Sequence, residues 1–156
     1  MAEPVTHSRA LPDPPATNAL GGLLAAALPD DYRGWLVLLQ GELGAGKSTL
    51  ARALLVALGH DGLVPSPTYT LVEPYELPRG NVYHVDLYRI SSADELHFLG
   101  FDELREGLML VEWPERVPDL VDDADLLVAL TYAGDGRRAD ITACSERATA
   151  LVRSLG

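Results

Sequence analysis

One stretch of the sequence contains the residue types of a phosphate-binding loop. Residues 41–48 match the pattern G-x-x-x-x-G-K-[ST], with an additional glycine at Gly44. Glycines let the backbone wrap around a phosphate with its N–H groups pointing inward, and a following helix adds its N-terminal dipole. Lys47 is expected to contact the β- and γ-phosphates, and the Ser48 hydroxyl to ligate Mg²⁺. The nucleotide-binding residues predicted here are Glu42, Leu43, Gly44, Ala45, Gly46, Lys47, Ser48 and Thr49.

Two carboxylates compete for the remaining roles at such a site. Asp86 ends the stretch 82–85, and Glu112 ends the apolar run 108–111. Ligands of open α/β sheets bind at the carboxyl ends of strands, where a carboxylate can hold a metal or position the attacking water. The alternative for each is a solvated side chain at a strand exit, and spacing alone does not divide the roles between them.

The lysine content bears on the identity of the base. Guanine-selective GTPases carry an Asn-Lys-x-Asp element, but Lys47 is the only lysine of this chain. This absence favours ATP over GTP, so the predicted cofactors are ATP and Mg²⁺.

The surrounding pattern predicts the elements that position these residues. Residues 34–40 form a nearly continuous apolar run of strand length, which indicates burial on both faces of a sheet. A helix is expected after the loop, with Leu50, Leu54, Leu55 and Leu58 on one side. Further strands are expected over 108–111, 124–133 and 138–144. The predicted fold class is a single α/β P-loop NTPase domain with a mixed, mostly parallel central sheet flanked by helices.

Shorter signals complete the predicted order of elements. Thr17 is a candidate N-cap for a helix over 18–27. A hairpin is expected from strands 68–76 and 81–87 around a turn at 77–80. Ser92 opens a capping-box pattern, and a closing helix is expected over 145–155. Because of four early prolines, residues 1–12 are predicted to be a flexible lead-in and residues 13–156 the domain.

Composition excludes several classes of protein. The chain has 156 residues, which suggests one domain, and its 12 Lys and Arg against 23 Asp and Glu give a net charge of −11. Such acidity argues against direct binding of DNA or RNA. No apolar run reaches the roughly 18–20 residues of a membrane span, and the N-terminus lacks a secretory apolar region. A lone cysteine, Cys144, fits the cytoplasm, which is the expected location.

Four motifs together resemble the bacterial TsaE (YjeE) family. They are residues 41–49, 66–72 (Ser-Pro-Thr-Tyr-Thr-Leu-Val), 83–89 (Tyr-His-Val-Asp-Leu-Tyr-Arg) and 111–114 (Val-Glu-Trp-Pro). Their order and spacing also match, over about residues 13–144. The resemblance implies a small ATPase required for N6-threonylcarbamoyladenosine modification at position 37 of tRNAs that read codons beginning with A. It further implies that ATP binding and hydrolysis reset the TsaB–TsaD unit and that TsaB and TsaD are the partners, with tRNA contacted only indirectly or weakly.

The same resemblance assigns roles to individual residues. Lys47 would contact the phosphates, Ser48 and Glu112 would hold Mg²⁺, and Asp86 would position water near the γ-phosphate. The loop that includes Ser66 and Thr68 resembles a switch. Trp113 is a candidate sensor or partner contact, with a half-buried packing role as the alternative. Arg137 resembles a family position that touches nucleotide.

Two functions of other classes stay open on the sequence. A small-metabolite kinase would need an acceptor pocket and usually an arginine-rich lid, whereas the only adjacent basic pair is Arg137-Arg138. A nucleotide-gated binding module with little turnover would use the same loop without rapid hydrolysis.

Overall fold

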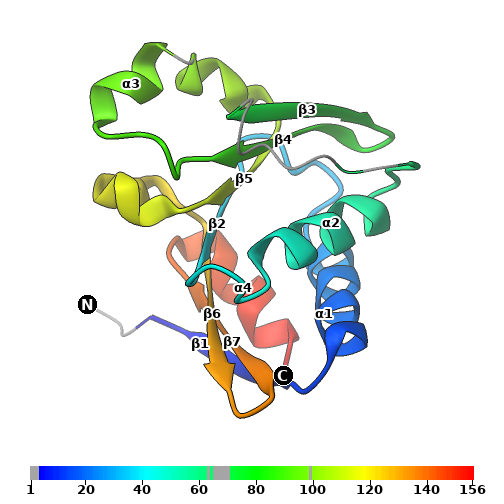
Figure 1. Ribbon diagram of the computed structural model, residues 1–156. Coiled ribbons are helices and arrows are strands. Elements are labelled where there is room, and N and C mark those ends of the chain that lie inside the picture. The colour runs from blue at the N-terminus through cyan, green and yellow to red at the C-terminus, as the bar shows by residue number, and fades with distance from the viewer. Residues whose placement is uncertain (1–3, 63, 65–70, 99) are drawn as a thin grey trace.

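A computed structural model describes residues 4–62, 64, 71–98 and 100–156, and within them seven strands form one sheet. Its strand order is β1-β7-β6-β2-β5-β4-β3 (Figure 1). The strands are β1 (Thr6–Leu11), β2 (Leu36–Gln40), β3 (Val72–Leu77), β4 (Gly80–Asp86), β5 (Leu108–Glu112), β6 (Leu126–Ala133) and β7 (Gly136–Ala143). The α-helices are α1 (Pro14–Ala27), α2 (Lys47–Ala57), α3 (Ala93–Phe98) and α4 (Glu146–Ser154), and 3-10 helices cover Phe101–Glu106, Pro114–Arg116 and Pro118–Asp123.

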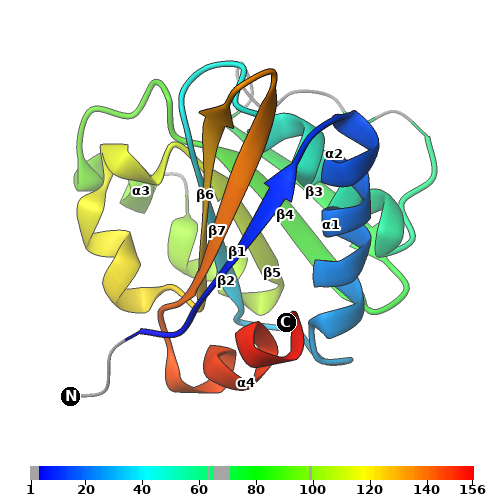
Figure 2. The same cartoon turned by 90° about the horizontal axis from the view of Figure 1, so that it is seen from below.

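The centre of the sheet is parallel and its edges are antiparallel. Strands β6, β2, β5 and β4 run in one direction, while β7 and β3 pair antiparallel to their neighbours. Alternate residues of the central strands enter two separate apolar clusters, one on each face. Helices α1 and α2 cover one face, and α3 with the 3-10 helices covers the other (Figure 2). The predicted α/β class with a mixed sheet is confirmed.

The start of the first helix differs from the prediction. Helix α1 begins at Pro14 rather than after Thr17, because the Asp13 carboxylate accepts the N–H of Ala16 at 3.0 Å and a proline occupies the first helical position. Thr17 is instead buried inside the helix. The predicted hairpin is confirmed for the described residues 71–86, with β3 paired to β4. Residues 65–70, which include the start of the predicted strand 68–76, lie outside the described residues.

The predicted flexible lead-in over residues 1–12 is wrong for residues 6–11. They form β1, which pairs with β7 from Thr6 opposite Thr142 to Leu11 opposite Arg137. Only Leu11 is fully buried, so this edge strand has almost no apolar signature. Its partner lies about 130 residues away in the chain, which no local pattern reveals.

Among the residues that the structure describes, no helix has the length and apolar character that crossing a membrane requires.

A buried carboxylate ties the sheet to the last helix. Asp125 precedes β6 and accepts hydrogen bonds from the N–H of Leu36 at 2.9 Å and from Ser145 and Arg147, each at 2.7 Å. The Arg147 guanidinium also lies over the Trp35 ring, 4.6 Å from its centroid. Burial raises the pKa of Asp125, but the hydrogen bonds from Arg147, Leu36 and Ser145 outweigh burial, and the net pKa lies below its ordinary value.

We expect Asp125→Ala to lower the free energy of unfolding at neutral pH by about 2 kcal/mol, because hydrogen bonds to a buried carboxylate are lost. The loss is not larger because Arg147 is half exposed and regains hydration when its partner is removed. Because the folded-state pKa is depressed, the stabilisation is complete above the ordinary value of 3.8 and is lost as the pH falls below it. Urea titrations between pH 7 and pH 3 measure this, with exposed Asp122→Ala as the control. An equal deficit for Asp125→Ala at both ends of that range would contradict it.

Candidate functional site

The predicted phosphate loop joins the carboxyl end of β2 to the N-terminus of α2. Gly46 is the N-cap of α2 with a φ of 110°, a left-handed conformation that favours glycine. Gly44 is also left-handed, and a Cβ added to it would lie 2.7 Å from the Tyr132 hydroxyl. The loop therefore has two left-handed glycines directly ahead of a helix N-terminus, an arrangement that suits the binding of an anion by backbone N–H groups.

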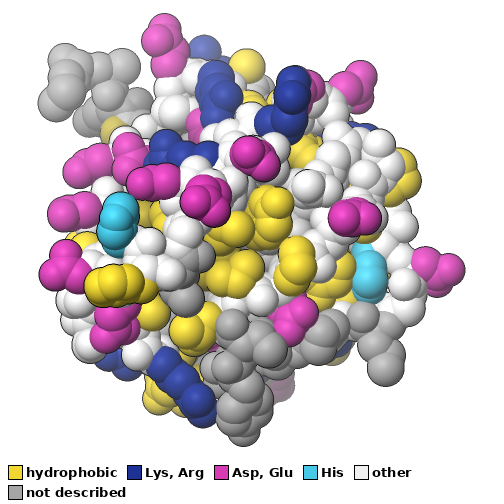
Figure 3. Space-filling view, turned by 90° about the horizontal axis from the view of Figure 1, so that it is seen from above, with side chains coloured by type: hydrophobic (Ala, Val, Ile, Leu, Met, Phe, Trp, Pro, Cys, Tyr) yellow, Lys and Arg dark blue, Asp and Glu magenta, His cyan; other side chains and the backbone are white. Residues whose placement is uncertain are grey.

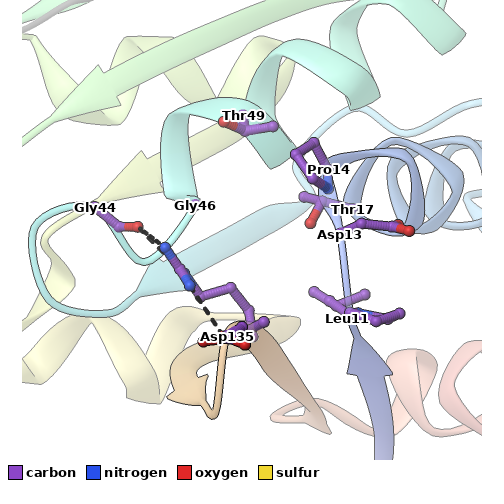
Figure 4. A pocket seen from close by; sticks show the side chains of 11 residues that line it. Leu11, Asp13, Pro14, Thr17, Gly44, Gly46, Thr49 and Asp135 are labelled. Carbon is purple, nitrogen blue, oxygen red and sulfur yellow. Dashed lines mark hydrogen bonds between the residues drawn. The ribbon is translucent and has the colours of Figure 1, made fainter.

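Two side chains from the β6–β7 hairpin hold this loop. The Tyr132 hydroxyl donates to the carbonyl of Leu43 at 2.6 Å. Arg137 donates to the carbonyl of Gly44 from Nε at 3.3 Å and from Nη2 at 3.1 Å, and the dashed line at Gly44 in Figure 4 marks this contact. The guanidinium also lies over the Tyr132 ring, 4.2 Å from its centroid. Because Tyr132 and Arg137 donate to the carbonyls of Leu43 and Gly44, the peptide groups of the loop are held in one orientation.

Lys47 is buried to 5 % exposure at the start of α2. Its ammonium donates to the carbonyl of Gly41 and, at 3.4 Å, to that of Glu42, and lies 3.6 Å from the centroid of the Trp113 ring. Burial lowers the pKa of Lys47, while the negative charge of Glu112 and its acidic neighbours opposes that effect. The ammonium is thus held in place by loop carbonyls and one aromatic face.

Glu112 is the centre of a buried hydrogen-bonded group. The Ser48 hydroxyl donates to its two carboxylate oxygens at 3.1 and 3.4 Å, and His84 Nε2 lies 2.5 Å from its Oε2 atom. All three reach the same place because Ser48 is on the first turn of α2, while β4 and β5 are adjacent parallel strands. Sequence reasoning identified Ser48 and Glu112 but did not select His84, whose alternation with Val85 was indistinguishable from that of a core residue.

Asp86 lies directly beside Glu112, since the two are register partners on β4 and β5. Its side chain is buried, and its Oδ1 atom accepts the N–H of Tyr88 at 2.8 Å. Neither carboxylate is the solvated strand-exit residue that the sequence left as the alternative.

Trp113 follows Glu112 in a left-handed conformation, with a φ of 59°. Few non-glycine residues adopt it, and such residues concentrate at functional sites. The ring packs against Tyr88 at a centroid distance of 4.9 Å as well as over Lys47. The turn therefore brings the half-buried aromatic side chain back over the phosphate loop.

These residues enclose a pocket of about 210 Å³ at the carboxyl edge of the parallel strands. It brings together most of the predicted site, but Glu42 and Ala45 do not line it: Ala45 is buried, and the Glu42 carbonyl accepts from Lys47. Ser66 and Thr68 lie outside the described residues. The lining residues are Leu43, Gly44, Gly46, Lys47, Ser48, Thr49, Asp86, Glu112 and Trp113.

A second pocket of about 240 Å³ adjoins the first and shares Gly44, Gly46 and Thr49 with it (Figure 4). Arg137 lines it, as do residues that sequence reasoning missed: Leu11, Pro12, Asp13, Pro14, Thr17, Asp135 and Gly136. These residues come from two places, the junction between β1 and α1 and the tip of the β6–β7 hairpin. The Asp-Pro-Pro helix start was a usable local signal, but the pairing that brings the two segments together was not.

The donor chemistry at the first pocket fits magnesium. Ser48 and Glu112 offer oxygen donors beside the loop, and Mg²⁺ is commonly bound by one or two protein oxygens together with substrate phosphates. Among the described residues, no three His, Cys, Asp or Glu side chains are arranged to hold a metal ion by themselves.

Comparison with known proteins places this geometry in context. A sequence profile of the family described as "Threonylcarbamoyl adenosine biosynthesis protein TsaE" matches residues 11–139. The tRNA threonylcarbamoyladenosine biosynthesis protein TsaE of Haemophilus influenzae is 43 % identical over 110 residues, which cover 69 % of this chain and 70 % of that protein. The protein of the same name from a Nostoc species is 37 % identical over 139 residues, with 85 % and 83 % covered.

A solved structure is similar over nearly the entire chain. The crystal structure of Bacillus subtilis YdiB superposes with a TM-score of 0.79 at 28 % sequence identity. The match covers 99 % of this chain and 97 % of that one.

We expect the buried Lys47 ammonium to reduce the stability of the protein without nucleotide. Because the folded-state pKa is lowered, wild-type stability should rise relative to Lys47→Met as the pH increases through that pKa toward the ordinary value of 10.5. Chemical denaturation of both proteins between pH 7 and pH 10 measures the difference. A difference in unfolding free energy that is constant over this range would contradict the expectation.

Proposed function

The chain belongs to the TsaE family, and from that premise we propose that it binds and hydrolyses ATP with Mg²⁺ in support of tRNA threonylcarbamoyladenosine formation. The observation that supports this most directly is the pocket in which the glycine loop, Lys47, Ser48, Asp86 and Glu112 meet. Phosphoryl transfer needs positioning and electrostatic stabilisation more than a strong base, and this pocket offers groups for both.

The two adjoining pockets suggest how ATP lies. The phosphates occupy the loop, where backbone N–H groups and the Lys47 ammonium balance their charge. The nucleoside extends into the second pocket, between the start of α1 and the hairpin tip, with Arg137 at the boundary between the two. In binding phosphate, Lys47 exchanges the carbonyls of Gly41 and Glu42 for charged oxygens.

Each remaining polar side chain has a distinct role in this proposal. Ser48 and Glu112 hold Mg²⁺, which when bound neutralises charge on the transferred phosphoryl group. Asp86, fixed by the N–H of Tyr88, orients the attacking water from the neighbouring strand. Lys47 stabilises the charge that develops between the β- and γ-phosphates.

The surface supports action through protein partners rather than through RNA. Acidic side chains are spread over the face in Figure 3, and the net charge is −11. A phosphate backbone is repelled by such a surface. We propose that TsaB and TsaD are the partners in the cytoplasm, that ATP turnover resets their complex, and that Trp113 senses the nucleotide or contacts a partner. Ser66 and Thr68 are proposed to act with it as a switch.

Arg137→Met should weaken ATP binding about tenfold, because the loop loses the two hydrogen bonds to Gly44 and the charge near the phosphates. Arg138→Met is the matched control, since the neighbouring guanidinium pairs with Asp140 and Ser8 away from the loop. Calorimetric titration with a slowly hydrolysed ATP analogue measures both. If both variants lost the same amount of ATP affinity, the effect would come from the removed positive charge in general and not from the contact of Arg137 with the loop.

Reconstitution of the modification tests the function as a whole. With purified TsaB and TsaD, the remaining components of the modification pathway, tRNA and ATP, wild-type protein should sustain repeated rounds of threonylcarbamoyladenosine formation, whereas Lys47→Ala should leave roughly a single round per TsaB–TsaD complex. Release of inorganic phosphate should increase when TsaB–TsaD is added.

Modification that proceeds equally without this chain would refute the proposal. Phosphate transferred to an added small acceptor would indicate a kinase. Nucleotide-dependent binding to TsaB–TsaD without phosphate release would indicate a gated binding module.

A further inference from the structure

His84 occupies a position that the roles above do not use. Its ring is 1 % exposed, and its Nε2 atom lies 2.5 Å from Oε2 of Glu112, which is itself buried. We propose that His84 is a positioning residue that holds the Glu112 carboxylate in the orientation required to bind Mg²⁺ with ATP. This inference rests on the proposed Mg²⁺–ATP function and adds a residue to its machinery.

The strand geometry aims both side chains at one place. His84 and Asp86 are two residues apart on β4 and therefore point to the same face of the sheet. On β5 the same face carries Leu110, the register partner of His84, and Glu112, the partner of Asp86. Val82 and Leu110 belong to the apolar cluster that also contains residues of α2, so this face is the one beneath Ser48.

Hydrogen-bond chemistry determines what His84 does for Glu112. A carboxylate that holds a cation is ionised and only accepts, so in that role of Glu112 the ring donates from Nε2 to Oε2. Ser48 donates to the same carboxylate from the opposite element, most closely to Oε1 at 3.1 Å. The Ser48 hydroxyl keeps lone pairs that it can offer to a cation, whereas the His84 nitrogen that donates to Glu112 has none to offer. His84 therefore keeps Oε2 fixed, while Oε1 is the oxygen nearer to Ser48, which lines the same pocket as Glu112.

The other ring nitrogen indicates that packing alone does not account for this histidine. Within the described residues, Nδ1 of His84 is buried with no hydrogen-bond partner. An unpaired buried polar atom is unfavourable, and an apolar side chain of similar size would fill the space without it. Among the described contacts, the hydrogen bond to Glu112 is what compensates for burying this polar ring. The histidine therefore stabilises the fold less than an apolar side chain would, but it fixes the position of the Glu112 carboxylate.

Three substitutions separate positioning from packing. His84→Gln places an amide nitrogen at about the reach of Nε2, His84→Asn places one nearer to Nδ1, and His84→Phe keeps the ring without a donor. The measurement is the Mg²⁺ concentration at half-maximal thermal stabilisation in saturating ADP, with ADP affinity in EDTA measured in parallel. We expect Phe and Asn to raise the Mg²⁺ midpoint about tenfold or more, and Gln to restore it to near the wild-type value. ADP affinity without metal should not change.

A second background tests whether the effect passes through Glu112. In Glu112→Gln protein, adding His84→Phe should change the Mg²⁺ midpoint less than about twofold, because coupled residues are non-additive. Equal midpoints in wild type and all three His84 variants, with only the melting temperature lowered, would overturn the positioning role and leave the ATPase proposal intact. Absence of any Mg²⁺-dependent stabilisation of wild type would overturn both.

Discussion

Ionisable groups buried at one edge of a sheet are the constraint on which the rest of this structure depends. Lys47, Asp86 and Glu112 are each at most 5 % exposed. A charge removed from water is tolerated only where opposite charge or hydrogen bonds replace its hydration. Here the replacements are loop carbonyls, the Trp113 ring, a backbone N–H, a serine hydroxyl and an imidazole, and none of them lies on the same element as the charge that it stabilises.

The parallel centre of the sheet is what makes those replacements available. Because β2, β4 and β5 run in one direction, their carboxyl ends open at the same edge, and the loop after β2 meets the carboxylates of the other two. Side-chain alternation then places Asp86 and Glu112 on the face covered by α2. The antiparallel edge strands have another role, since the β6–β7 hairpin extends past this edge and carries Tyr132 and Arg137 to the loop.

Local patterns predicted the parts of the site that local chemistry determines. The glycine loop, Ser48, and the carboxylates at the ends of two strands follow from short motifs read in order along the chain. Strand β1 could not be found in this way, because its polar sequence becomes a strand only through pairing with β7. The contact between His84 and Glu112 was hidden for a similar reason, since it depends on which strands are neighbours. The left-handed turn at Trp113 has no sequence signature comparable to a glycine.

The pairing of β1 with β7 has a consequence for the order in which the protein becomes competent during synthesis. The second pocket is lined by residues 11–14 and Thr17 from the start of the chain and by residues 135–137 from the β6–β7 hairpin. These two sets of residues lie far apart in the chain, and bringing them together carries an entropic penalty that only the completed pairing of β1 with β7 offsets. On the ribosome the phosphate loop emerges early, whereas the pocket beside it cannot close until β7 has left the exit tunnel. A nascent chain therefore lacks the finished pair of adjoining pockets until its sheet is complete.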